Sequence, residues 1–112
     1  MSIIDCNDGR KRLANRHEAE TFDLDAGGQH YRATIGRFPE NGRLAEIFIS
    51  NSKAGSQADC IARDASVVAS IALQFGVPLD VLRNALMRDA RGKANGPLGV
   101  ALDMVAEMEG AQ

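Results

Sequence analysis

The sequence of 112 residues predicts an α+β fold, with an antiparallel sheet of about three strands followed by three helices packed on one face. Apolar side chains recur at every second position between residues 20 and 50, and at every third or fourth position after residue 56. Strands therefore precede helices along the chain. This length is typical of one domain, so we expect a single α+β domain over residues 19–110. The polar residues 1–18 are expected to form a mobile basic arm before it.

Two hairpins are predicted in the first half of the domain. Apolar and acidic residues alternate over 21–25, and the glycine pair 27–28 then supplies a tight turn. The period of two continues over 31–35, and the sequence Pro-Glu-Asn-Gly at 39–42 forms a second turn. The segment LAEIFIS, 44–50, is apolar on both faces, so we expect it to be the central strand. The sheet edges stay open, and a homodimer is expected to close them.

A first helix should begin near Gln57, because Ser56 and Asp59 form a start that resembles a capping box. Gly76 should end it, since glycine readily adopts the left-handed conformation found after helices. An apolar stripe on this helix is expected to pack across the sheet. The stripe consists of Ile61, Ala65, Val67, Val68, Ile71, Ala72 and Phe75.

Two shorter helices should follow. The second is expected near residues 78–90, where proline suits the first turn, and it should bury Leu79, Leu82 and Leu86. A basic loop, RGKANG, occupies residues 91–96. Pro97 then starts the third helix. Its predicted buried face consists of Leu98, Leu102, Val105 and Met108.

The cysteines and histidines do not form a recognisable metal or redox motif. Cys6 and Cys60 make no C-x-x-C pair, and no zinc-ligand spacing joins them to His17 or His30. Each histidine stands alone, which is typical of a solvated or hydrogen-bonded side chain. We expect a reduced cytoplasmic protein without a metal or cofactor. The sequence lacks a signal-peptide pattern and a run long enough to cross a bilayer.

Two further side chains could carry chemistry. Cys60 falls in the first turn of the first helix, where the helix dipole favours a thiolate, but its apolar neighbours favour simple packing. Glu46 lies in an otherwise apolar strand, where a carboxylate needs a partner or a raised pKa. We favour a salt bridge from Glu46 to Arg43 or Arg63 over acid–base chemistry. The sequence therefore offers no complete catalytic site.

Two polar regions form the candidate interaction surface. Lys53, Gly55 and Ser56 precede a helix, where backbone amides and a positive charge could hold an anion. They lack the spacing of a P-loop, so a capping turn is favoured. The basic residues of the arm could contact phosphates or an acidic protein surface, but no aromatic residue lies among them, so a solvated tail is favoured. These basic residues are Arg10, Lys11, Arg12 and Arg16.

Over residues 12–108 the chain resembles the TSCPD-type region near the C-terminus of adenosylcobalamin-dependent (class II) ribonucleotide reductases. The resemblance is most specific in AEIFI, KAGS and LQFGVPL, which follow one another in the same order and spacing. The stretches RLANR, GGQHY, ATIGRF and NGRLAEIFIS also take part. The family label would be ribonucleoside-diphosphate reductase, but the catalytic barrel of that family and the Thr-Ser-Cys-Pro-Asp motif are absent here. Reductase chemistry is therefore not carried over to Cys6 or Cys60.

The first functional hypothesis is a non-catalytic accessory or regulatory module that acts by protein contact in deoxynucleotide metabolism. Its expected partners are a second copy of the chain and a ribonucleotide reductase. The alternative is a nucleic-acid or nucleotide binder that uses the basic arm together with residues 91–96. A net charge of −2 argues against a generally basic surface, so such binding would have to be local. An enzymatic role for Cys60 or Glu46 ranks last.

Overall fold

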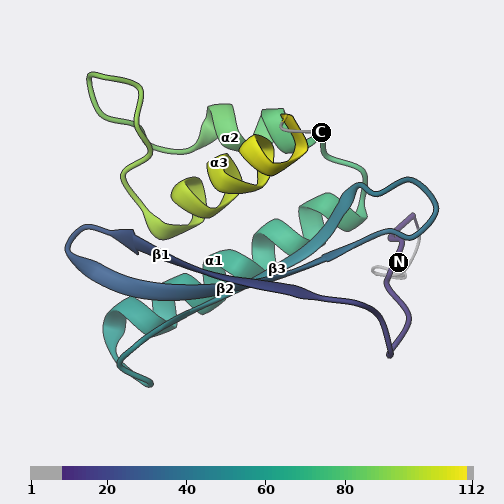
Figure 1. Ribbon diagram of the computed structural model, residues 1–112, viewed down its shortest axis with the longest axis horizontal. Coiled ribbons are helices and arrows are strands. Elements are labelled where there is room, and N and C mark those ends of the chain that lie inside the picture. The colour runs from purple at the N-terminus through teal and green to yellow at the C-terminus, as the bar shows by residue number, and fades with distance from the viewer. Residues whose placement is uncertain (1–8, 111–112) are drawn as a thin grey trace, which may run out of the picture.

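The computed structural model describes residues 9–110 and contains a three-stranded antiparallel sheet and three helices (Figure 1). The predicted fold class and order of elements are confirmed. The elements are β1 (Glu20–Ala26), β2 (Gln29–Arg37), β3 (Leu44–Asn51), α1 (Gln57–Gln74), α2 (Leu79–Ala85) and α3 (Pro97–Gly110). No helix in this part of the chain is long and apolar enough to cross a membrane.

The sheet has the strand order β1-β2-β3, so β2 is the central strand. The prediction that residues 44–50 form the central strand is therefore wrong. Gly27 and Gly28 join β1 to β2 with φ values of 58° and 77°, the positive angles that a tight two-residue hairpin turn needs. One sheet face packs on the helices and supplies most of the core. Its fully or nearly fully buried side chains include Leu24, Tyr31, Ala33, Ile35, Ile47 and Ile49.

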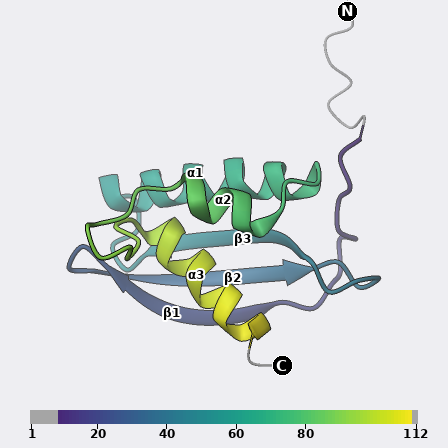
Figure 2. The same ribbon diagram turned by 90° about the horizontal axis from the view of Figure 1, so that it is seen from above.

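Helix α1 runs alongside the outer edge of β3 (Figure 2) and takes the place of a fourth strand. Ser66 Oγ accepts the backbone N–H of Ile49 at 2.9 Å. Ser70 Oγ accepts the N–H of Ile47 at 3.0 Å and donates to its carbonyl oxygen at 2.9 Å. The apolar composition of β3 on both faces thus reflects cover by a helix at its edge, not a place in the middle of the sheet.

The hydrogen bonding between α1 and β3 extends along the helix because four residues of helix are nearly as long as two residues of strand. Four residues of helix rise about 6 Å and two residues of strand about 6.6 Å. Gln74 Nε2, four residues after Ser70, donates to the carbonyl oxygen of Ala45 at 3.1 Å. At the other end Asp59 Oδ1 accepts the N–H of Asn51 at 2.9 Å. One of the two sheet edges that a homodimer was expected to close is thus covered within the chain, and the homodimer itself stays a prediction.

The apolar stripe predicted for α1 does not face the sheet. Small and polar side chains face β3, because the helix must approach closely enough to hydrogen-bond a strand edge. The buried positions on α1 are Asp59, Ala62, Ser66, Ala69, Leu73 and Gln74. Of the predicted stripe, Ile61, Val67, Val68 and Phe75 are exposed, and Ala65, Ile71 and Ala72 are only partly buried. The predicted start at Gln57 and the end before Gly76, which has φ 99°, are confirmed.

Helix α2 is shorter than predicted and ends at Ala85, where the chain enters a loop closed by a bridge between Arg88 and Ala94. Leu79 and Leu82 of α2 and Leu86, which directly follows it, are only partly buried and not buried as expected, because they pack at the margin of the core. Helix α3 crosses the sheet toward β1 (Figure 2). It buries Leu102 and Val105 as predicted, while Leu98 and Met108 are partly buried.

Three charged side chains join α2, the following loop and α3. Asp103 accepts Nε of Arg83 at 2.9 Å, and its two carboxylate oxygens each accept a nitrogen of Arg88 at 2.8 Å. These hydrogen bonds, those from Arg88 first, lower the pKa of the Asp103 carboxyl from 3.8 to about 2. The loop after α2 is therefore fixed to α3 by a bidentate ion pair.

Replacing Ser66 with alanine should lower the free energy of unfolding by about 1–3 kcal/mol, because the buried N–H of Ile49 then loses its acceptor. Denaturant titration followed by circular dichroism measures the change. Ser52→Ala, at an exposed loop position, is the control and should leave stability within about 0.5 kcal/mol. Equal stability of the two variants would contradict the edge-pairing role of Ser66.

Asp103→Asn should lower stability near neutral pH by about 2 kcal/mol, since the carboxylate has a depressed pKa in the folded state. This stabilisation is present above about pH 4 and is lost as the pH falls through about 2. Acid unfolding of wild type and variant should therefore converge at low pH. Asp64→Asn, on the exposed side of α1, should leave the acid midpoint unchanged. A constant stability difference between wild type and Asp103→Asn down to pH 2 would refute the assignment.

Candidate functional site

Residues 10–18, the arm segment, cross one end of the sheet and contact the domain. Arg10 Nε donates to Gln74 Oε1 at 2.7 Å, and the backbone N–H of Lys11 donates to the carbonyl oxygen of the same glutamine at 2.9 Å. Lys11 Nζ also pairs with Glu40 at 2.9 Å. The described part of the predicted basic arm is thus held beside the C-terminal end of α1.

The arm segment packs directly against the backbone of β2. A Cβ atom added to Gly36 would lie 2.9 Å from Leu13 Cδ1 and 2.9 Å from Glu46 Oε1, closer than real Cβ contacts. A glycine inside a strand is typical of such a close approach. Gly36 lies on the sheet face opposite to the core, so the arm segment covers one end of this open face.

His17 fastens the arm segment to β3. Its Nδ1–H donates to the carbonyl oxygen of Ala14 at 2.7 Å, and its Nε2–H donates to Glu46 Oε1 at 2.5 Å. Both partners are acceptors, so the ring is doubly protonated in this arrangement, and the two bonds raise the pKa of His17. Glu46 thus forms a salt bridge, as predicted, but the predicted partners Arg43 and Arg63 are wrong, because the arm segment folds back and supplies His17 instead. With both nitrogens engaged, His17 is not placed to act as a general base.

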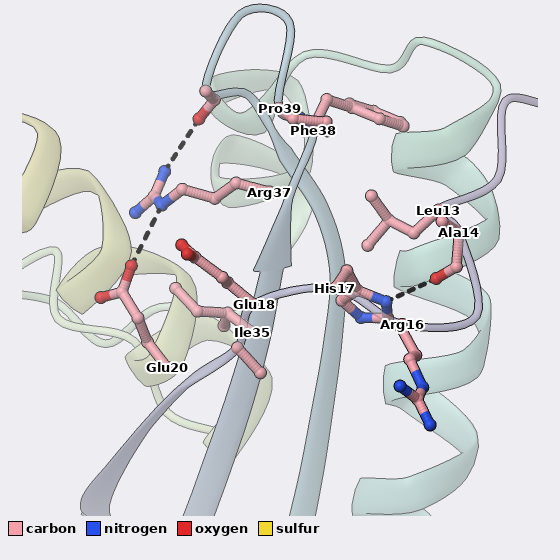
Figure 3. Close-up of a pocket in the computed structure, with 12 residues that line it drawn as sticks. Leu13, Ala14, Arg16, His17, Glu18, Glu20, Ile35, Arg37, Phe38 and Pro39 are labelled. Carbon is pink, nitrogen blue, oxygen red and sulfur yellow. Dashed lines mark hydrogen bonds and ion pairs between the residues drawn. The ribbon is translucent and has the colours of Figure 1, made fainter.

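A cleft of about 800 Å³ lies between the arm segment and the end of β2 (Figure 3). Arg37 forms part of its wall and pairs with Glu20 at 3.6 Å and with Glu109 of α3 at 2.8 Å. The apolar lining of the cleft comes from Leu13, Ile35, Phe38 and Pro39. Besides Arg37 and Glu20, the charged residues that line the cleft are Arg16, His17 and Glu18. The cleft has the size of a small-molecule site, but three of its charged residues, His17, Glu20 and Arg37, already have charged partners.

The predicted anion position at Lys53, Gly55 and Ser56 is a capping turn. Ser56 Oγ accepts the N–H of Asp59 at 3.1 Å, and Asp59 Oδ2 accepts the N–H of Gly55 at 3.0 Å. These amide bonds, those from Gly55 and Asn51 foremost, lower the pKa of Asp59, so a carboxylate of the chain itself occupies the place of an anion. This turn lies at the opposite end of α1 from the arm segment, about 27 Å away, so the two halves of the predicted surface do not meet.

The remaining candidate residues lie apart from each other. Cys60 is exposed on α1, so the expectation that it packs in the interior is wrong. Cys6 lies outside the described residues. His30 pairs with Asp25 at 2.9 Å and lies 3.8 Å from Asp23, on the open sheet face. Within residues 9–110, no three His, Cys, Asp or Glu side chains are placed to hold a metal ion.

Similar proteins are vitamin B12-dependent ribonucleotide reductases. The protein of Rhodopirellula baltica is 35% identical over 75 residues, or 67% of this chain, and that of Streptomyces clavuligerus is 33% identical over 78 residues, or 70%. The protein of Agrobacterium fabrum is 34% identical over 71 residues, or 63% of this chain. This chain is related to a segment of these reductases. The matched segment makes up only 7%, 8% and 6% of the three relatives.

The relationship to ribonucleotide reductases agrees with the resemblance seen in the sequence. No family model and no solved structure matches the chain. Two residues that position the arm segment escaped the sequence reasoning, although one of them gave a signal. Gly36 is a glycine within a strand pattern, which is typical of a close backbone approach. Leu13 gave none, because nothing local links it to residues more than 20 positions away.

The arm segment should loosen as the pH rises. The pKa of His17 is raised in the folded state, so its contribution to binding the arm is fully present below about pH 6.5 and is lost as the pH rises through the higher folded value. Hydrogen exchange at residues 10–18, corrected for intrinsic exchange rates, should show less protection at pH 8.5 than at pH 6. Glu46→Gln should remove most of this pH dependence, whereas Glu18→Gln should retain it. We call the His17–Glu46 hydrogen bond the latch of the arm segment. An identical pH dependence in both variants would contradict its role in holding this segment.

Proposed function

We propose that this chain is a non-catalytic accessory module of the TSCPD type, which binds a vitamin B12-dependent ribonucleotide reductase. An exposed apolar groove between α1 and α2 carries the proposal. Its volume is about 500 Å³. It is lined by Ile61, Asp64, Ala65, Val68, Ala69, Ala72, Leu82, Leu86 and Leu98.

The groove is apolar enough to favour a protein partner. Val68 is 68% exposed and Ile61 is 56% exposed. Both are bulky apolar residues, yet they lie outside the buried face of α1. Contiguous exposed apolar surface of this kind is typical of protein contact sites. Asp64 alone among the lining residues carries a charge, so a complementary partner would present mainly apolar side chains.

The relatives support a reductase as this partner. In the matched proteins the related segment amounts to 6–13% of a much longer chain. Such a segment lies in the same polypeptide as the rest of the reductase, and its apolar surface can pack against that remainder. In this chain the α1–α2 groove would make the equivalent contact with a separate reductase protein.

The polar side chains of the domain support a non-catalytic role. His17 uses both ring nitrogens for the latch, and Asp59 and Asp103 each accept several hydrogen bonds. Groups engaged in this way stabilise the fold and are not poised to transfer protons. A contact function fits them better than an acid–base or nucleophilic mechanism.

Val68→Lys should weaken binding to a vitamin B12-dependent ribonucleotide reductase by at least about tenfold, because it places a charge in the apolar groove. Val81→Lys is the matched control, since Val81 is 55% exposed on α2 and lies outside the groove. Biolayer interferometry with the purified proteins measures both affinities.

The proposal would be overturned if wild type did not bind the reductase at micromolar concentration, or if both variants bound like wild type. Sedimentation equilibrium of the chain alone tests whether a second copy of the chain occupies the groove instead of a reductase. A concentration-dependent dimer that Val68→Lys abolishes would show that a second copy fills the groove, against the proposal.

A further inference from the structure

The open face of the sheet presents an aromatic ring beside the arm segment. The strand pair Gly36 and Glu46 is covered by the arm segment, and the next pair on the same face is Thr34 and Phe48. Phe48 is 45% exposed, and the guanidinium of Arg63 lies over its ring at 5.1 Å from the centroid. The exposed fraction makes the ring accessible, and a planar ligand stacked on it would share or displace the contact with Arg63.

Two adjoining hollows connect this ring to the basic residues of the arm. The first, of about 360 Å³, is lined by Phe48 and Thr34 together with Val67 and Ile71 of α1. The second, of about 260 Å³, is lined by Arg12, Asn15 and His17 among others. Arg10, Glu46 and Gln74 line both hollows, so the two are adjacent, and we call them together the Phe48–Arg12 groove.

The two ends of the groove differ in chemistry. At one end Phe48 lines a hollow together with the apolar Val67 and Ile71 of α1, and an aromatic ring beside apolar side chains suits the binding of a flat ring. At the other end are Arg10 and Arg12, while the charge of Glu46 is balanced by His17. Arg10 uses Nε for Gln74, and among the described residues its terminal amino groups make no other hydrogen bond. These groups can donate to an anion.

We propose that the Phe48–Arg12 groove binds a nucleotide unit, with the base stacked on Phe48 and the phosphate held by Arg10 and Arg12. Phe48 lies two residues from Glu46, about 6.6 Å along β3, and Glu46 already borders the arginine end. This spacing is comparable with the reach from a base to its 5′-phosphate. A free nucleotide and a single-stranded nucleic acid share this chemistry.

The groove is distinct from the contact surface proposed for the reductase. Val67 and Val68 are neighbours on α1, but Val67 borders the Phe48–Arg12 groove and Val68 lines the α1–α2 groove. Nucleotide binding and reductase binding can therefore be abolished separately, and the two proposals succeed or fail independently.

Isothermal titration calorimetry at 50 mM salt tests the groove with dATP, inorganic triphosphate and a short oligo(dT) strand. Phe48→Leu should weaken dATP binding at least about tenfold and leave triphosphate binding within about twofold. Phe75→Leu is the matched control, because Phe75 is 46% exposed and lies outside the groove. The double variant Arg10→Ala/Arg12→Ala should weaken both ligands, and the affinity of wild type should fall as salt is raised.

The source of the nucleotide follows from the same titrations. Tight binding of dATP indicates a free nucleotide, and binding of oligo(dT) alone indicates a single strand, each dependent on Phe48. Two results would overturn the proposal. One is the absence of binding of both dATP and oligo(dT) to wild type at millimolar concentration, and the other is equal behaviour of Phe48→Leu and Phe75→Leu. Circular dichroism of each variant confirms that a loss of binding does not come from unfolding.

Discussion

The outer edge of β3 needs hydrogen-bond partners, and α1 supplies them from its side chains. Ser66, Ser70 and Gln74 are spaced by four residues on the helix and meet β3 at every second residue. A helix whose small and polar residues face β3 takes the place of a fourth strand. The β3 edge of the sheet is therefore covered by the chain itself. The position of every other surface follows from this arrangement, since α1 then has one face against the strand and another free.

The free side of α1 is where the proposed functions lie. Its bulky apolar residues, which would fill a core in an ordinary sheet-packing helix, point outward and border two different grooves. One lies toward α2 and is apolar except for Asp64, and the other lies toward the open sheet face and ends at the arm segment. The His17–Glu46 latch determines how the second groove is closed at its basic end.

The relationship to vitamin B12-dependent ribonucleotide reductases gives these surfaces a context. The related segment is a small part of those proteins, and the proposed contact of this chain with a reductase rests on that relationship. The described polar residues are used to hold the arm, the capping turn and the loop after α2. We therefore propose a function for the surfaces of the chain and not for a catalytic cluster.

Local patterns in the sequence determined the strands, the glycine turn at 27–28, the cap at Ser56 and the helix start at Pro97, because each depends on neighbours within a few residues. They also carried the relationship to the reductases. Only the tertiary structure decided that β2 and not β3 is central, that Glu46 pairs with His17, and that Phe48 and Arg10 line the same hollow. Each of these depends on the long-range pairing of α1 with the edge of β3. The periodicity of apolar residues in the sequence cannot distinguish a helix that pairs with a strand edge from one that packs across a sheet.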